Sequence, residues 1–510
     1  MSFAEQLPVL PIITPLLLAP ITILLPKGRA AWAWATFISW LVFFFCASLL
    51  VAVYHHDGPI SYALGDWLAP LGIEYRIDLA NGLLLFLISG MGALVFPYAY
   101  HSINAEIDER QTPLFYSALL LCMTGLLGVT ITGDAFNVFV FFEIASLSTY
   151  ALVALGARQD RRALTAAFNY LVMGTIGATF FVIGVGLLYQ ATGTLNMEDL
   201  RVQLTNLDNR MVQSGFAFIF VGMGLKLAMF PLHLWLPGAY AHAPSSVSAF
   251  VAATSTKVAL YVLIRFFYTI FHAAYGIDFG SLYMILQYVL LPLAVAGMFV
   301  ASLVAVFQDC VKRMLAYSSV AQIGYMLLGL SLGTTTGLTA TMVHMFNHAL
   351  MKGALFMAVG CVVLRLGGHT VRQFSGLFYR MPMTATAFLV AGLSLVGVPL
   401  TVGFVSKWTL LQATFEAGQW PASFLIVASS LIAVVYVGRI VEIMIRKPDS
   451  SVAAPVAAPV AAVSEAPLSM LVPMIVLVAA NLYFGVQTDL TVDTARGAAD
   501  ALFVVGEGAH

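Results

Sequence analysis

Charged side chains are scarce in this chain. Only 9% of its 510 residues are Asp, Glu, Lys or Arg, and 61% are hydrophobic. Soluble domains carry roughly 25% charged residues, so the composition excludes a soluble protein and indicates an integral membrane protein. Because the apolar residues come in long runs, we expect an all-α membrane protein that crosses the lipid bilayer many times rather than a barrel.

Cysteine motifs, basic surfaces and cofactor motifs are also lacking. The four cysteines stand singly in apolar runs without a CxxC pair, so no disulfide framework, zinc site or iron–sulfur site is predicted. The net charge of -1 offers no basic surface for nucleic acid. No nucleophile motif, Gly-rich phosphate loop or redox ligand set appears. We therefore expect no enzymatic site in this chain, no metal and no cofactor.

The long apolar runs predict fourteen membrane helices, at about 20 residues for each crossing. The predicted spans are 8–25, 31–53, 78–98, 113–132, 134–156, 163–190, 212–236, 244–272, 282–306, 313–333, 336–364, 383–415, 422–445 and 467–486. The first span is expected to be retained, because the segment before it holds Glu5 and lacks the basic residues of a signal peptide.

Basic residues are distributed unevenly between the two sets of loops. Loops after odd-numbered helices hold thirteen of them, whereas loops after even-numbered helices hold only Arg76, Arg201 and Arg210. The positive-inside rule therefore places the odd loops in the cytoplasm and both termini outside it. The Ala/Pro-rich stretch 446–466 is predicted to be a flexible cytoplasmic linker. Loops 54–77 and 191–211 are too short to fold alone.

Two apolar runs combine a proline with a lysine. Lys226 precedes Pro231 in one run, and Lys407 follows Pro399 in another, one run in each half of the chain. Proline removes a backbone hydrogen bond and kinks or breaks a helix. Broken helices beside a buried charge are a common arrangement in ion-transporting membrane proteins and indicate an internal structural repeat.

Glu143, Lys226 and Lys257 stand in the middle of apolar runs. A charge at the centre of a membrane helix costs at least about 2.5–3.5 kcal/mol, so these side chains are expected to face the protein interior or a wet cavity. We predict that Glu143 pairs with Lys226 and that both lysines relay protons. The alternatives are a purely structural ion pair for Glu143 and an interfacial position for a lysine.

His344, His348 and Lys352 follow one another at intervals of four residues, which places them on one face of a helix. Histidine titrates near physiological pH, so this face predicts a polar path for protons through an apolar helix. Two alternatives stay open. The histidines could share a zinc ion, although no cysteine or carboxylate completes its ligands, or they could only bond to neighbouring helices.

Several further positions have competing interpretations. Lys407 could end the proton path or reach the membrane surface. His242, in the elbow HAPSS, could lie at a channel mouth or be a simple loop residue. Arg265, Arg439 and Glu442 lie nearer to helix ends, so interface anchoring or a local ion pair is the better interpretation for them.

Several of these segments resemble a known family. TGDAFNVFVFFE, GLKLAMFPLHLWLPGAYAHAPSSVSA, the lysine of TSTKVALY and HMFNHALMKGALF are similar to the antiporter-like subunits of complex I, membrane-bound hydrogenases and Mrp cation/proton antiporters. The resemblance covers roughly residues 75–445. It implies two inverted five-helix repeats, each with a discontinuous helix, and a hydrophilic axis of Glu, Lys and His in the membrane plane.

The resemblance also implies a division of the chain and a role for four residues. The division is 1–112 (three N-terminal helices), 113–272 (first repeat), 282–445 (second repeat), 446–466 (linker) and 467–510 (last helix and tail). Glu143 matches the family's fifth-helix glutamate, Lys226 and Lys257 its seventh- and eighth-helix lysines, and Lys407 the lysine of the second broken helix. GDAFNVFVFFE and YQATGTLNMEDL resemble the D-type subunit of the Mrp antiporters. Lysine at position 407 argues against the middle complex I subunit, for which the resemblance implies glutamate there.

These observations predict a D-type subunit of a multisubunit Na+(K+)/H+ antiporter in a bacterial inner membrane, with other membrane subunits as partners. Protons would move along Glu143, Lys226, Lys257, His344, His348, Lys352 and Lys407. The first alternative is a proton-pumping subunit of a complex I-type oxidoreductase or membrane-bound hydrogenase. The second is a scaffold subunit whose charges only hold helices together.

Overall fold

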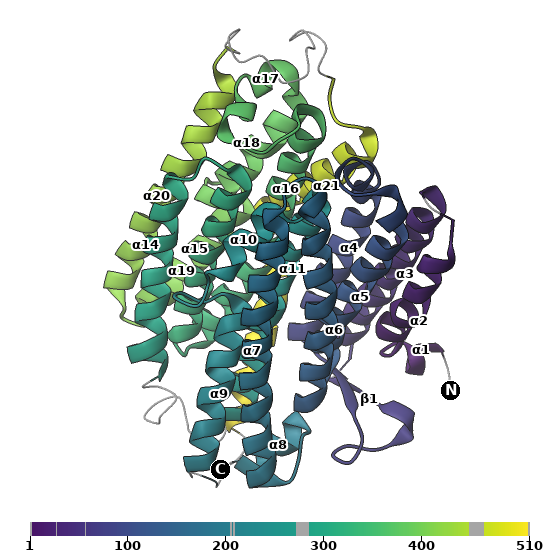
Figure 1. Cartoon of the computed structure of the whole chain (residues 1–510). Coiled ribbons are helices and arrows are strands. Elements are labelled where there is room, and N and C mark those ends of the chain that lie inside the picture. Colours follow the sequence, from purple (N-terminus) through teal and green to yellow (C-terminus); the bar gives the residue numbers. More distant parts are fainter. Residues whose placement is uncertain are drawn as a thin grey trace.

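The computed structural model describes residues 3–26, 28–56, 58–204, 207, 210–271, 285–447 and 464–507. Most of the predicted linker 446–466 and the first three residues of the predicted span 282–306 lie outside this part. The helices run side by side along the long direction of the molecule (Figure 1). The N-terminal helices lie at one side of this view and the helices of the second half at the other, with α7, α9 and α11 between them.

The first half of the chain contains α1 to α11. Its helices are α1 (Phe3–Gln6), α2 (Leu10–Leu24), α3 (Arg29–Tyr54), α4 (Leu79–Glu106), α5 (Thr112–Ile131), α6 (Ala135–Ala154), α7 (Arg162–Thr192), α8 (Met197–Leu204), α9 (Arg210–Leu227), α10 (Trp235–His242) and α11 (Ser245–Ile264). The π-helical η4 (Arg265–Phe271) continues α11. Strands β1 (Ile60–Ala63) and β2 (Glu74–Ile77) form an antiparallel hairpin that pairs Ile60 with Ile77.

The second half begins with η5 (Leu286–Leu290), which leads into α14. Its helices are α14 (Leu291–Val306), α15 (Val311–Ser331), α16 (Thr335–Leu366), α17 (Leu377–Arg380), α18 (Pro382–Val396), α19 (Val402–Glu416), α20 (Trp420–Ile445), α21 (Leu468–Val486) and α22 (Asp489–Glu507). Short 3-10 turns connect others: η1 (Leu64–Asp66), η2 (Glu109–Gln111), η3 (Leu155–Arg158) and η6 (Val371–Phe374).

Eleven helices of the described residues are long and apolar enough to cross a membrane, and α2 and α18 are shorter apolar helices. The chain is therefore a multi-pass membrane protein with an almost entirely helical fold. Polar residues fix the helix ends. The Asp78 carboxylate accepts a hydrogen bond from the backbone N–H of Asn81 at the start of α4. Thr334 caps the start of α16, and Gly367, with φ 73°, caps its end.

Both helices predicted to be broken are interrupted at their proline. The first ends at Leu227 and resumes at Trp235, with Pro231 in the gap, and the second stops at Val396 and resumes at Val402, with Pro399 in the gap. A non-glycine residue with positive φ stands in each gap: Ala228 at 59° and Leu400 at 70°. Such a conformation is uncommon outside glycine, so the two interruptions share an unusual backbone feature as well as a proline.

The structure contains three elements that the sequence did not predict, because the segments that hold them were expected to be loops or a tail. Loop 54–77 contains the β hairpin, loop 191–211 contains α8, and the predicted tail after residue 486 contains α22. The hairpin is anchored through Glu74, whose carboxylate accepts hydrogen bonds from Ser61 and from Asn196 beside α8. These elements gather at one end of the molecule, where β1, α8 and the C-terminus lie in Figure 1.

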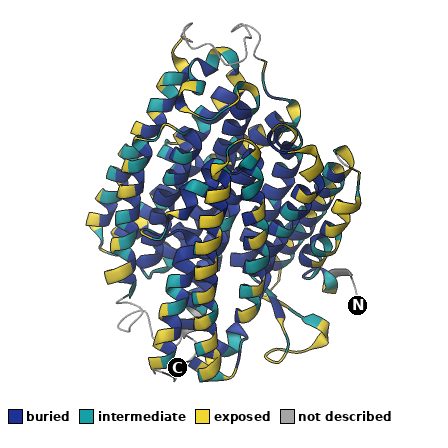
Figure 2. Cartoon of the chain, in the orientation of Figure 1, coloured by how far each residue is buried: buried dark blue, intermediate teal, exposed yellow. Residues whose placement is uncertain are grey.

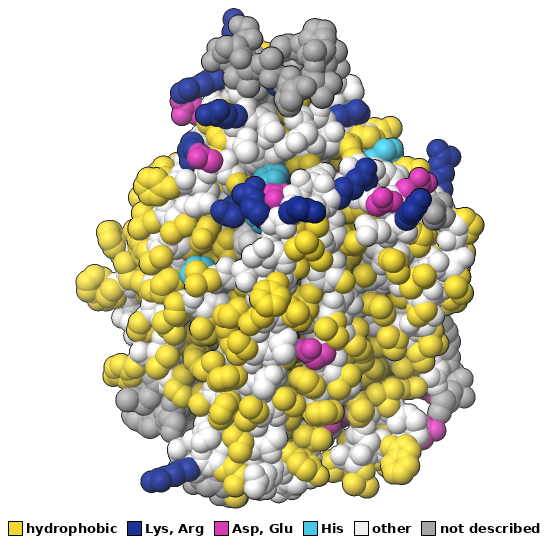
Figure 3. Space-filling view, viewed as in Figure 1, with side chains coloured by type: hydrophobic (Ala, Val, Ile, Leu, Met, Phe, Trp, Pro, Cys, Tyr) yellow, Lys and Arg dark blue, Asp and Glu magenta, His cyan; other side chains and the backbone are white. Residues whose placement is uncertain are grey.

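Burial follows the pattern of a membrane protein. Buried residues fill the centre, whereas exposed residues lie on the outward faces of the outer helices (Figure 2). In the space-filling view a broad hydrophobic band crosses the molecule, and most of the visible Lys and Arg side chains lie beyond its upper edge (Figure 3). The basic end is opposite the end that carries the hairpin.

Helices α7 and α9 pack closely through glycines, which positions the lysine of α9. A Cβ atom on Gly222 would lie 2.7 Å from the carbonyl oxygen of Gly177 and from the backbone N of Phe181. Close backbone approach at small residues is the usual packing of membrane helices.

We expect Gly222→Ala to lower the amount of assembled protein strongly, because backbone atoms cannot move aside for the methyl group. Gly186→Ala on α7 is the matched control, since a Cβ there meets nothing within 4 Å among the described residues. Quantifying assembled complex after detergent extraction checks the difference. Equal yields of the two variants would show that this contact does not set the α7–α9 packing.

Candidate functional site

Glu143 and Lys226 lie together between α6 and α9. The Lys226 Nζ is 3.5 Å from Glu143 Oε1 and donates a 2.7 Å hydrogen bond to the Ser146 hydroxyl. It also lies 5.4 Å from the centre of the Phe142 ring. The lysine side chain is 6% exposed and the glutamate 25%, so the pair reaches from the interior to the protein surface. The structure thus places Glu143 and Lys226 within ion-pair distance, as the sequence predicts.

A small cavity lies beside Lys226. Its volume of about 10 Å³ is enough for roughly one water molecule. Thr149, Tyr170 and Ser255 contribute polar groups to its lining, and Ser255 belongs to α11. The cavity therefore extends from Lys226 toward the helix that carries Lys257.

Lys257 is completely buried in the middle of α11. Its Nζ donates a 2.5 Å hydrogen bond to the carbonyl oxygen of Ala252. A lysine with no exposed surface cannot extend to a membrane interface, so the geometry argues against the interfacial alternative. Within the described residues no hydrogen bond joins Lys226 to Lys257.

Helix α16 carries His344, His348 and Lys352 on one face, and all three are buried. The rings of the two histidines stack with their centres 6.1 Å apart. The Lys352 ammonium donates to the Leu315 carbonyl at 2.8 Å and to the Ser318 hydroxyl. Helices α11 and α16 pack against each other, so Lys257 and the three polar groups of α16 belong to neighbouring helices.

The two histidines differ in their hydrogen bonding. His344 Nδ1 lies 2.8 Å from the Ser406 hydroxyl, and its Nε2 lies 2.9 Å from Gln322 Oε1. Neither ring nitrogen of His348 has a partner in the part of the chain that the structure describes. Because both nitrogens of His344 are engaged, the geometry argues against a zinc ion shared by the pair. The described residues also contain no group of three or more His, Cys, Asp or Glu that could hold a metal.

Lys407 lies on α19 and faces the end of α18. Its Nζ donates to the carbonyl oxygens of Leu395 and Val396, at 3.1 and 2.8 Å, and lies 5.0 Å from the centre of the Tyr325 ring. Carbonyls at a helix C-terminus carry partial negative charge and stabilise a cation. The side chain is buried, so the surface-reaching alternative does not fit.

His242 ends α10 at the basic end of the molecule. Its Nδ1 lies 3.3 Å from Asp160 Oδ2, and its Nε2 lies 3.5 Å from Arg313. The hydrogen bond from Arg162 lowers the pKa of Asp160 to about 2, so this carboxylate stays charged throughout the physiological range. The predicted role of His242 at a channel mouth stays a prediction.

The three charges interpreted as local partners do form ion pairs. Arg265 pairs with Asp78, Arg439 lies 3.0 Å from Asp309, and Glu442 pairs with Arg446.

Sequence reasoning missed a second buried charge cluster. The carboxylate of Glu106 accepts hydrogen bonds from the backbone N and hydroxyl of Ser245, at the start of α11. Lys312 is 2% exposed and donates to the Ala243 carbonyl at 3.0 Å. The predicted spans leave both residues in loops, 99–112 and 307–312, where a charge ordinarily indicates exposure to water or to lipid headgroups. The signal that could have found them is the HAPSS turn, which needs a partner for the N-terminus of α11.

If the predicted proton path follows this face of α16, we expect His348→Ala to slow proton transfer by roughly tenfold or more, because it removes the ionisable group between His344 and Lys352. His369→Ala is the control. Burial lowers the pKa of His369 to about 4, so it is neutral from pH 5 to 8, and it lies in the loop after α16. The measurement is the proton flux of the two variants in vesicles that hold equal amounts of assembled complex. Equal flux in both variants would remove His348 from the path.

Comparisons with known proteins place this geometry in a family. Residues 132–433, which include the described broken helices and all seven predicted relay residues, match the family model "NADH:quinone oxidoreductase/Mrp antiporter, TM". The chain belongs to the NADH:quinone oxidoreductase/Mrp antiporter family. The resemblance seen in the sequence motifs is thereby confirmed.

Two relatives from this family match most of the chain. The N subunit of the NADH-quinone oxidoreductase of Desulforudis audaxviator is 43% identical over 425 residues, which cover 82% of this chain and 83% of that protein. The D subunit of the Na(+)/H(+) antiporter of Bacillus subtilis is 31% identical over 433 residues and 85% of each chain.

Chains of two solved structures share the fold along nearly the whole length of this chain. A chain of the archaeal membrane-bound sulfane sulfur reductase matches with a TM-score of 0.87 and 32% identity, covering 98% of this chain and 99% of that one. A chain of the Mrp complex from Dietzia sp. matches with a TM-score of 0.86 and 24% identity, covering 99% and 98%; at that identity the likeness concerns the fold.

Proposed function

We propose that this chain translocates protons coupled to Na+ or K+ as the D-type subunit of a multisubunit cation/proton antiporter. The observation that carries the proposal is the Glu143–Lys226 contact at 3.5 Å. This pair stands at one end of a series of ionisable groups, and Glu143 is partly exposed at the protein surface. The series continues through Lys257, His348, Lys352 and His344 to Lys407. Apart from Glu143, each group is buried among the helices of an integral membrane protein, where an ionisable side chain indicates an ion pathway.

The ion pair supplies the coupling in this proposal. While Glu143 and Lys226 are in contact, the carboxylate neutralises the positive charge of the Lys226 ammonium. When the pair separates, this unpaired positive charge repels a proton on Lys257 or its neighbour. That proton then moves along the face of α16 toward Lys407. The partial exposure of Glu143 supports a partner membrane subunit at this surface, because an uncovered carboxylate in lipid would be costly.

The membrane arrangement belongs to the proposal as well. The eleven long helices, together with α2 and the broken pairs α9–α10 and α18–α19, make fourteen crossings. The basic end faces the bacterial cytoplasm, and both termini lie on the other side. Residues 113–272 and 282–445 form two inverted five-helix repeats, a division supported by the matching interruptions at Pro231 and Pro399. Residues 1–112, 446–466 and 467–510 are the N-terminal helices, the linker and the C-terminal part.

A second candidate has its own supporting observation. The relative with 43% identity bears the name of an NADH-quinone oxidoreductase subunit, and the sulfane sulfur reductase is described as a respiratory membrane complex. This chain would then use the same groups to pump protons, driven by electron transfer in partner subunits. The energy source separates the two candidates.

The test is ΔpH-driven cation/proton exchange in vesicles that hold the whole complex, with and without a reductant. Exchange that depends on Na+ or K+ and needs no electron donor supports the antiporter. Exchange that is absent until NADH, hydrogen or another reductant is added rejects it in favour of the redox-driven pump.

A further inference from the structure

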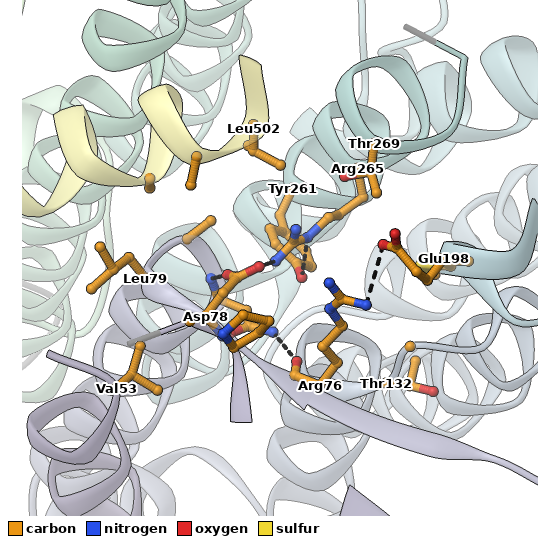
Figure 4. A pocket seen from close by; sticks show the side chains of 18 of the residues that line it. Val53, Arg76, Asp78, Leu79, Thr132, Glu198, Tyr261, Arg265, Thr269 and Leu502 are labelled. Atoms are coloured by element: carbon orange, nitrogen blue, oxygen red, sulfur yellow. Dashed lines mark hydrogen bonds and ion pairs between the residues drawn. The ribbon is translucent and has the colours of Figure 1, made fainter. Parts of the chain in front are cut away.

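A large cavity lies at the end of the molecule that carries the β hairpin, and none of the seven proposed relay residues lines it. Its volume is about 270 Å³, and it is bounded by the hairpin, the start of α4, η4 and the C-terminal helix α22. Charged side chains converge on it from separate elements (Figure 4): Arg76 from β2, Asp78 before α4, Glu198 from α8 and Arg265 from η4. Glu74 of β2 also lines it.

The carboxylates of this cavity are already engaged. Asp78 pairs with Arg265, and Glu198 lies 3.2 Å from Arg76. Glu74 accepts a 2.6 Å hydrogen bond from the Ser61 hydroxyl and a 2.9 Å hydrogen bond from the Asn196 amide. No carboxylate of the set is left to bind a cation, so the chemistry of the cavity fits water rather than a resident metal ion.

One wall of the cavity leads toward Lys257. Tyr261 and Arg265 lie four and eight residues after Lys257, on the same face of the helix, and eight residues span about 12 Å. The Arg265 Nε donates a 2.8 Å hydrogen bond to the Tyr261 hydroxyl, and its guanidinium binds Asp78 on the facing element. Figure 4 shows Tyr261, Arg265 and Asp78 joined across the cavity. Tyr261 is thus the cavity-lining residue of this helix nearest to Lys257 in sequence, and the bridge holds its hydroxyl through Arg265.

A further polar atom faces this region without a partner. The hydroxyl of Thr269, one turn after Arg265, lines the cavity and has no hydrogen-bond partner among the described residues. Buried polar atoms of this kind are usually satisfied by ordered water when the site is roomy, and this cavity has room for several molecules.

We propose that this cavity is a water-filled access route from the extracytoplasmic side to Lys257, closed by the Arg265–Asp78 bridge. The inference rests on the proposed function. When the bridge opens, the stem of Lys257 turns from Ala252 toward Tyr261. The ammonium gives a proton to the Tyr261 oxygen while the hydroxyl gives its own proton to water in the cavity, so the tyrosine carries no net charge before or after the transfer.

The first test removes the bridge without leaving a buried unpaired charge. In vesicles that hold the complex with Arg265→Gln and Asp78→Asn together, an imposed ΔpH is expected to collapse at least several-fold faster than in wild type without added Na+ or K+. Adding Lys257→Ala to this variant is expected to restore the slow decay. A double variant that holds ΔpH like wild type, or a leak that persists without Lys257, would overturn the proposal.

The second test leaves the bridge intact, so it serves even where the double variant fails to assemble. Ala501 lines the cavity, whereas its neighbour Asp500 on α22 is exposed but does not. We expect a membrane-impermeant thiol reagent on the extracytoplasmic side to slow exchange several-fold in Ala501→Cys and to leave Asp500→Cys unchanged. Equal exchange in both modified variants would contradict a water route here.

The same preparations separate this inference from the proposed function. If Lys226→Ala abolishes exchange while the bridge and thiol variants behave like wild type, the antiporter function stands and the access route falls. If Lys226→Ala also exchanges normally, the proposed function itself falls.

Discussion

Vesicles that hold the complex with Lys226→Ala or Glu143→Ala are expected to show no ΔpH-driven cation/proton exchange. Each substitution leaves the other charge without its partner at 3.5 Å, so the pair can no longer alternate between a joined and a separated state. The measurement is the exchange rate at matched amounts of assembled complex, because loss of a partner for a buried charge also lowers stability.

Arg439→Gln is the control for this pair. Arg439 also belongs to a membrane helix and lies 3.0 Å from a carboxylate, that of Asp309, but it lies in the last two turns of its helix and is not one of the proposed relay groups. Its substitution should leave exchange unchanged. If Lys226→Ala and Glu143→Ala assemble and transport like Arg439→Gln, the assignment of the ion pair is wrong.

Lys257 gives the second large effect, and two substitutions there separate transport from scaffolding. Lys257→Ala removes the group, whereas Lys257→Arg keeps a permanent positive charge that cannot release its proton. If Lys257 relays protons, both variants lose exchange at matched assembly. If it only holds helices together, alanine mainly lowers assembly, and arginine recovers both assembly and exchange.

The experiment therefore needs both an assembly and a transport measurement on each variant. Lys257 has no exposed surface, so the larger guanidinium also strains its surroundings. Variants that assemble poorly are compared per assembled complex. Exchange in Lys257→Arg at the wild-type rate would contradict the relay.

The course of the chain through the membrane was largely predictable from sequence, since hydrophobic length alone locates membrane helices. Both interruptions were predictable from proline, because Pro231 and Pro399 act on the backbone locally. Helix α22 was not, since its alanines alternate with Asp493, Arg496 and Asp500 on the exposed face and so lack a continuous apolar run. The β hairpin was also missed, because its strands are only four residues each.

The residues of the candidate site could be predicted from the sequence, but their hydrogen-bond partners could not. Buried lysines and histidines are conspicuous in an apolar sequence, so Glu143, Lys226 and the α16 face could be selected from it. Their partners could not. Ser146 and Gln322 look like ordinary polar residues of membrane helices, and the carbonyl that receives Lys257 is a backbone group that every residue possesses. Which backbone groups are unpaired depends on tertiary structure.

The interruption of α18–α19 gives one end of the proposed series hydrogen-bond acceptors that a side-chain substitution does not remove. Lys407 is held by the main-chain oxygens of Leu395 and Val396, not by an acidic side chain. These acceptors cannot be protonated at any physiological pH and cannot be deleted by exchanging a neighbouring residue. In the proposed path Lys407 therefore differs from Lys226, whose partner Glu143 is a side chain that one substitution removes. A substitution of Tyr325 changes the surroundings of Lys407 but leaves both carbonyl acceptors in place.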